Sequence, residues 1–232
     1  ISSTQAINPA LYAKLGFDPV KDFEPISMLA TVPNVLVAHP SLPADTLPEL
    51  IALAKAQVAD PIQYASAGNG TLNHLLGEML KSRAGIPLTH VPYRGTAPAV
   101  TDMLAGHVDT MFENYPSVQS YIASGELRPL AIGSARRSPL VPNLPTMIEE
   151  GVPNYDSSSW FGLFLRAGTP AGAIDAVNRA INEGLRDQAT IGRLTTTGVE
   201  PIGGSPADFK AYVTRRFEET GALIRAAGIT AG

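Results

Sequence analysis

Strand-like and helix-like segments alternate along residues 61–134, with only short turns between them. Residues 62–65 are typical of a buried strand, and a glycine-rich loop joins them to an amphipathic helix that starts at Thr71. Three further strand-like segments follow in the same order, at 88–93, 108–114 and 128–133. Strands and helices that alternate at this spacing predict right-handed crossovers and a parallel sheet covered on both faces. This pattern indicates an α/β fold.

The helix after the first strand has the clearest periodicity in the chain. Its apolar residues recur at the spacing of one buried face: Leu72, Leu75, Leu76, Met79 and Leu80. Gly85 follows this helix as its natural C-cap. Another helix is expected to precede the unit, because Thr46 and Glu49 have the spacing of a capping box.

The remaining segments come from both ends of the chain. Strand-like runs stand at 26–30, 34–38 and 160–165. Thr169–Pro170 and Ser205–Pro206 are each typical of a helix start. We therefore expect the chain to cross twice between two lobes. The first lobe would contain residues 1–40 and 158–232, and the second would contain residues 41–157.

Composition and charge exclude several classes of protein. Charged residues make up 16% of the chain and the net charge is -4, without a stripe of Lys and Arg, so we expect no nucleic-acid partner. The chain has no cysteine, which excludes disulfides, thiolate metal sites and cysteine nucleophiles. Because the chain has no run of about 18 apolar residues, no membrane-spanning helix is predicted.

The sequence also lacks the usual signatures of catalysis and metal binding. The four histidines do not have the spacing of metal ligands: His39, His74, His90 and His107. We interpret His74 as a boundary residue of its Leu-rich helix, and Glu149–Glu150 and Glu218–Glu219 as solvated helix faces. No GxSxG elbow occurs. We expect no metal, cofactor or catalysis, and a small-molecule enzyme on the same fold is the alternative.

The loop at residues 66–71 is the best candidate for ligand contact. In an open parallel sheet the ligand lies at the carboxyl ends of the strands, where this loop leads into a helix. Its glycines let the backbone approach an anion, and Ser66, Asn69 and Thr71 add polar side chains. The loop lacks both nucleotide-binding fingerprints, so a carboxylate is favoured over a phosphate. A tight turn with Thr71 as an ordinary N-cap is the alternative.

Two neighbouring loops follow the next two strands. In the first, the hydroxyl of Tyr93, the guanidinium of Arg94 or the hydroxyl of Thr96 could meet a carboxylate. In the second, the side-chain amide of Asn114 could donate to a ligand. Glu113 stands beside it and would repel an anion, so we expect Glu113 to face away from the site.

Four segments match one known pattern when they are taken together: YASAGNGT at 64–71, HVPYRG at 90–95, MFEN at 111–114 and SSWFGLF at 158–164. They resemble the substrate-binding proteins of tripartite tricarboxylate transporters, the Bug family. The resemblance covers essentially the whole chain. It implies a type II periplasmic-binding-protein fold with doubly wound sheets, whose two lobes close on a small carboxylate. It also implies a location in the periplasm and delivery of the ligand to a membrane permease, without a cofactor.

The resemblance further implies which residues bind the ligand. In the second lobe they would be Ser66, Gly68, Asn69, Gly70, Thr71, Tyr93, Gly95, Thr96 and Asn114. The first lobe would contribute Ser3 and Thr4. At the position of Glu113, members of the family more often carry a shorter side chain.

The resemblance implies a first lobe that is incomplete at its N-terminus. Members of the family begin about 70 residues earlier, with a strand, a loop, a helix and further strand–helix structure that complete the first lobe. A loop rich in proline and glycine in that segment makes a main contact with the carboxylate. A truncated form that no longer binds ligand is therefore a further alternative.

Overall fold

The computed structural model describes residues 4–12 and 14–230. Ser3, one of the two expected first-lobe contacts, lies outside the described residues, and so does the side chain of Thr4, the other one. Within these ranges, no helix combines the length and the apolar character needed to cross a membrane.

The chain divides into two compact units. One contains the residues up to Val32 together with those from Ser159 onward, and the other contains Pro33–Ser158. The boundary expected after residue 40 is therefore too late. Strand β2 (Asn34–Ala38) belongs to the second unit because it pairs with two strands of the sheet there.

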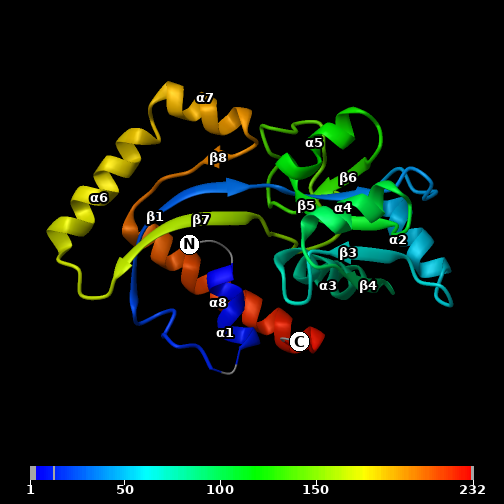
Figure 1. The fold of residues 1–232 in the computed structure, drawn as a ribbon, viewed down its shortest axis with the longest axis horizontal. Helices are drawn as coiled ribbons and strands as arrows, with labels where there is room; N and C mark the ends of the chain where they lie inside the picture. Colours follow the sequence, from blue (N-terminus) through cyan, green and yellow to red (C-terminus); the bar gives the residue numbers. More distant parts are fainter. Residues whose placement is uncertain (1–3, 13, 231–232) are drawn as a thin grey trace. The chain divides into compact units, whose positions relative to one another are not determined.

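Within Pro33–Ser158, all of which the structure describes, the sheet has five strands in the order β4-β3-β5-β2-β6 (Figure 1). Besides β2 these are β3 (Gln63–Ser66), β4 (Thr89–Pro92), β5 (Thr110–Asn114) and β6 (Arg128–Ile132). β3 pairs in parallel with β4 and β5, as the alternating segments predict. β2 instead runs antiparallel to β5 and β6, so the sheet is mixed. The chain enters β2 directly from β1 (Phe23–Val32) of the other unit, with only Pro33 between them, so no crossover within this sheet sets the direction of β2.

Helices cover both faces of this sheet (Figure 1). They are α2 (Leu47–Ala56), α3 (Leu72–Ala84), α4 (Thr96–Leu104) and α5 (Tyr115–Ala123). Side chains alternate along β2, so Leu36 and Ala38 pack into the core under α2 and α3. Val35 and Val37 pack into a separate core under α4 and α5. The second unit is therefore a sheet between two helical layers.

The periodicity of α3 is confirmed. The predicted face packs into the core, with these residues buried or half-buried: Leu72, Leu75, Leu76, Met79 and Leu80. The helix ends at Gly85, whose φ of 62° is the left-handed conformation of a C-cap. Thr71 precedes the helix but makes no side-chain cap, because its hydroxyl donates to the carbonyl oxygen of Gly68.

Helix α2 begins with the predicted capping box. The amide of Glu49 donates to Oγ1 of Thr46, and the carboxylate of Glu49 accepts from the amide of Thr46. Replacing Thr46 by alanine is expected to lower the free energy of unfolding by about 1 kcal/mol, since one cap is lost. Urea denaturation followed by circular dichroism measures the loss. Thr46→Ser keeps the hydroxyl and is expected to stay near the wild type; an equal loss in both variants would contradict the capping role.

Among its described residues, the first unit has a three-stranded antiparallel sheet in the order β7-β1-β8. The strands are β1 (Phe23–Val32), β7 (Ser159–Arg166) and β8 (Glu200–Pro201). Trp160 and Met28 of this sheet pack against Phe209 of α8 (Pro206–Ala227). Gly162 lies directly under Phe209, since a Cβ at Gly162 would stand 2.0 Å from the ring.

The helices of the first unit differ in how deeply they pack. Besides α8 they are α1 (Thr4–Leu11), α6 (Ala171–Gly184) and α7 (Gln188–Thr196). α1 and α8 contribute fully buried side chains, whereas α6 and α7 contribute none. α6 starts after Pro170 rather than with Thr169 as its N-cap, because the Thr169 hydroxyl donates to the carbonyl oxygen of Arg166. Ser205 caps α8 as predicted.

Candidate functional site

Three loops meet at the carboxyl ends of the parallel strands in the second unit. They are residues 66–71 at the end of β3, 93–96 after β4 and 113–115 at the end of β5, and we call them together the loop edge. The amide of Gly95 donates to the carbonyl oxygen of Ala67 at 3.1 Å. Oγ1 of Thr96 donates to Oε2 of Glu113 at 3.1 Å. The structure therefore brings all of the expected second-lobe residues to one edge of the sheet.

Three helices begin at the loop edge. α3 starts at Leu72, α4 at Thr96 and α5 at Tyr115, each directly after or at the end of one of the loops. The first amides of a helix have no partner within the helix, and its N-terminus carries a partial positive charge. Arg94 is the one cationic residue in these loops, and it is exposed. The loop edge is suited to an anion chiefly through backbone dipoles.

Two glycines give loop 66–71 its shape. The φ angle is 133° at Gly68 and 71° at Gly70, and residues with a side chain rarely adopt either value. A Cβ on Gly68 would stand 3.2 Å from the carbonyl oxygen of Tyr93 in the neighbouring loop. Gly68 therefore lets loop 66–71 lie close to loop 93–96, in addition to leaving room for a ligand.

Part of the hydrogen bonding in loop 66–71 is internal. The amide of Gly68 donates to Oγ of Ser66 at 3.1 Å, and the hydroxyl of Thr71 donates to the carbonyl oxygen of Gly68 at 2.7 Å. The amide of Gly70 donates to Nδ1 of His74 at 3.0 Å. These bonds hold the loop in shape without a ligand. They also occupy the amides of Gly68 and Gly70, two residues that we expected to contact the ligand.

Two histidines support this loop. The rings of His74 and His90 stack with their centroids 3.8 Å apart and their planes 5° apart, and Tyr64 stacks on His90 at 4.9 Å. Nε2 of His90 lies 2.6 Å from Oγ of Ser66. His74 is buried rather than a boundary residue, because its Nδ1 accepts from the loop. The pairing of β3 with β4 places His90 beside Tyr64, and this register is what could have pointed to a role for His90.

The contact between Ser66 and His90 has the distance of a nucleophile and its base, which the enzyme alternative would need. Ser66 is fully buried, however, and its Oγ also bonds with Gly68. Burial, followed by the neighbouring His74, lowers the pKa of His90 to about 4, too low for a general base at neutral pH. In the described part of the chain, no carboxylate accepts from the His90 ring. The pair holds the loop and does not resemble a catalytic dyad.

Glu113 does not face away from the loop edge, in contrast to the expectation. It is only 2% exposed. Its Oε2 accepts from Nδ2 of Asn73 at 3.0 Å and from Oγ1 of Thr96, while its Oε1 accepts from the amide of Asn114 at 2.8 Å. Burial raises the pKa of Glu113, and these hydrogen bonds oppose the increase. Three donors therefore make it possible to bury this carboxyl group where an anion is expected nearby.

The remaining expected side chains differ in their freedom. The hydroxyl of Tyr93 donates to Oδ2 of Asp102 at 2.9 Å; burial and this bond raise the pKa of Tyr93 to about 12. Asn69 is exposed at the tip of its loop, and Asn114 is half-buried. Throughout residues 4–12 and 14–230, no cluster of three or more His, Asp or Glu side chains could hold a metal ion.

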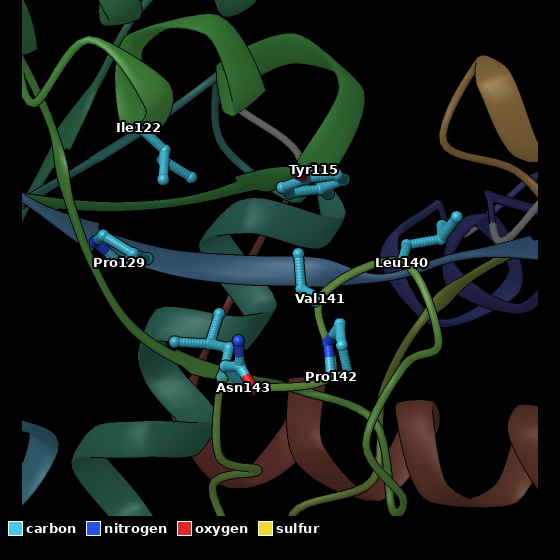
Figure 2. A pocket seen from close by; sticks show the side chains of 8 residues that line it. Tyr115, Ile122, Pro129, Leu140, Val141, Pro142 and Asn143 are labelled. Atoms are coloured by element: carbon cyan, nitrogen blue, oxygen red, sulfur yellow. The ribbon is translucent and has the colours of Figure 1, made fainter.

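An apolar pocket of about 390 Å³ lies in the same unit and shares Tyr115 with the loop edge. Its lining residues are Tyr115, Ile122, Pro129, Leu140, Val141, Pro142, Asn143 and Leu144. Figure 2 shows Tyr115 and Ile122 on one side of the pocket and Pro142 and Asn143 on the other. None of the expected ligand-binding residues lines this pocket, and its apolar walls do not suit a carboxylate.

The low pKa of His90 makes folding sensitive to acid. The unfolded chain takes up this proton near pH 6.5, but the folded protein does so only near pH 4. The free energy of unfolding is therefore expected to fall as the pH drops through this window, by about 1–2 kcal/mol once solvent screening is allowed for. Urea denaturation at a series of pH values measures the slope. His90→Gln cannot titrate and is expected to give a flatter profile; a profile as steep as the wild type would contradict the assignment.

Residues 1–229 match the sequence model of a family described as the tripartite tricarboxylate transporter family receptor. The chain is 35% identical to Protein BugT of Bordetella pertussis over 227 residues, which cover 98% of this chain and 69% of BugT. It spans about two thirds of the length of the curated relatives that it matches.

The chain is also similar to solved structures of proteins with bound carboxylates. A protein of R. palustris solved with adipate is 33% identical, with a TM-score of 0.86, and the match covers 100% of this chain and 78% of that one. MatC from Rhodopseudomonas palustris, with bound malate, is 27% identical, with a TM-score of 0.78, and the match covers 96% of this chain and 77% of that one. The α/β fold predicted from the sequence is confirmed.

Proposed function

Because the chain belongs to the tripartite tricarboxylate transporter receptor family, we propose that it binds a small carboxylate and delivers it to the membrane permease of such a transporter. The observation that carries this proposal is the loop edge, where three helices begin beside each other. Two of the structurally similar proteins were solved with a carboxylate, one with adipate and one with malate. Another structural relative is described as the periplasmic binding protein BugD, so we propose the periplasm as the place of action.

The chemistry of the loop edge supports an anionic ligand of this kind. The positive N-terminal ends of α3, α4 and α5 would attract and bind one carboxylate group. The side chains of Asn69 and Asn114 would add hydrogen bonds, and Arg94 would add a charge from the surface. Backbone donors of this type recognise the carboxylate rather than the rest of the molecule. Ser3 and Thr4, and closure of the two lobes on the ligand, are part of the same proposal.

Calorimetric titration of the chain with adipate, malate and citrate tests the proposal. We expect at least one of these acids to bind, because the loop edge offers donors for a carboxylate. The matched control is the diamide of adipate, which has the same carbon chain and no charge, and which is expected not to bind. If no acid binds, or if acid and diamide bind equally, the proposed function fails. Chemical conversion of a bound acid would instead favour an enzyme.

A further inference from the structure

The histidine pair joins loop 66–71 at two points. His74 comes from α3 and His90 from β4, and their rings are in face-to-face contact with centroids 3.8 Å apart. His74 receives the amide proton of Gly70, while His90 shares a proton with the hydroxyl of Ser66. The start of the loop at Ser66 is therefore held by His90, and its end at Gly70 is held by His74.

A protonated His74 is incompatible with this arrangement. Because the amide of Gly70 is a donor, Nδ1 of His74 must be an unprotonated acceptor. A proton on Nδ1 would set two donors against each other and break the bond. A charge on both rings at 3.8 Å would add strong repulsion between them. Burial is the main cause that lowers the pKa of each histidine.

The surroundings offer little to stabilise a protonated ring. Tyr64 of β3 stacks on both histidines, and its hydroxyl donates to Glu78 of α3 at 2.6 Å. Lys81 of α3 also bonds to Glu78, at 2.8 Å, so the negative charge of Glu78 is already shared. From β5, Glu113 faces Asn73 and not the rings. In the described part of the chain these are the charged and titratable groups that surround the pair.

We propose that His74 and His90 are positioning residues that hold loop 66–71 in its ligand-binding conformation only while both rings are neutral. Acid then breaks the bond to Gly70, loosens the loop and weakens carboxylate binding. The binding part of this inference rests on the proposed function, whereas the effect on the loop does not. A ligand captured at neutral pH would be released more readily where the medium is acidic.

The loop is tested first, in the ligand-free chain. Nuclear magnetic resonance follows the amide signal of Gly70 and the ring signals of His74 from about pH 7 to about pH 4. Both are expected to shift with one midpoint. In His74→Asn, whose side-chain oxygen accepts from Gly70 without titrating, the Gly70 signal is expected to stay in place. Titration of the His74 ring without movement of Gly70, or loss of the folded circular dichroism spectrum before Gly70 moves, would overturn the proposal.

Binding is tested second, with adipate as the probe. From about pH 7 to about pH 4, the affinity of the wild type is expected to fall at least about 10-fold more than that of the double variant His74→Asn, His90→Gln. Adipate gains protons equally in both experiments, so the difference belongs to the histidines. His39→Gln, changed at the opposite end of the sheet after β2, is expected to behave as the wild type. Parallel loss of affinity in the wild type and the double variant would overturn the inference.

The two tests separate two kinds of failure. If neither adipate nor another carboxylate binds at neutral pH, the proposed function fails, and the Gly70 titration still decides whether the pair controls the loop. If adipate binds but its affinity falls in parallel with the double variant, the proposed function stands and the role of the histidines is refuted.

Discussion

Replacing Glu113 by alanine is expected to lower the free energy of unfolding by about 3 kcal/mol, the largest loss that we anticipate from a single side chain at the loop edge. The reason is the set of donors that the carboxyl group satisfies: Nδ2 of Asn73, Oγ1 of Thr96 and the amide of Asn114. Alanine would leave these buried or half-buried donors without the carboxylate, although Nδ2 of Asn73 also donates to the carbonyl oxygen of Phe112. Equilibrium denaturation in urea at neutral pH measures the change.

Glu113→Gln is the matched variant, because it keeps the shape and one acceptor oxygen. We expect a loss of about 1 kcal/mol for it, since its amide group cannot accept on the other side. Glu126→Ala, at an exposed position of the same unit, is expected to change stability by less than about 0.5 kcal/mol. The interpretation of Glu113 as a satisfied buried acceptor is wrong if alanine and glutamine cost the same.

Gly68→Ala is expected to weaken carboxylate binding at least about 10-fold, because the backbone there must keep a φ of 133°. The added Cβ would also press on the carbonyl oxygen of Tyr93 at 3.2 Å. Relief of this strain would move loop 66–71 away from loop 93–96, and so separate two parts of the loop edge. Calorimetric titration with the carboxylate that binds the wild type measures the loss.

Gly85→Ala provides the control at the other end of the same helix. Its φ of 62° also disfavours alanine, but nothing lies within 4 Å of a Cβ there and the site is not affected. We expect this variant to lose about 1 kcal/mol of stability and to keep its affinity. If Gly85→Ala weakens binding as much as Gly68→Ala, the effect comes from general destabilisation of α3 and not from the loop.

Local sequence patterns predicted the second unit well. Apolar spacing gave α3 and its C-cap at Gly85, and the capping box gave the start of α2, because these features depend on residues within a few turns of each other. The partners of β2 could not be predicted in this way. Its four apolar residues, 35–38, fit either unit, and only pairing with β5 and β6, distant in the sequence, assigns it to the second.

The candidate site shows the same limit. The three loops were predicted because each one ends a strand, and parallel strands end at one edge. Glu113 and the histidine pair were misread because their partners come from other segments, such as Asn73 for Glu113 and His90 for His74. A charged residue beside an anion site suggests repulsion until its donors are known.

Nuclear magnetic resonance during titration with the carboxylate that binds best tests whether this ligand binds at the loop edge. If the loop edge is the binding wall, the largest changes in amide signals are expected in residues 66–71, 93–96 and 113–115. Two results would contradict binding at the loop edge. One is a set of changes centred on residues 140–144 of the apolar pocket, and the other is no change at any of the three loops under saturating carboxylate.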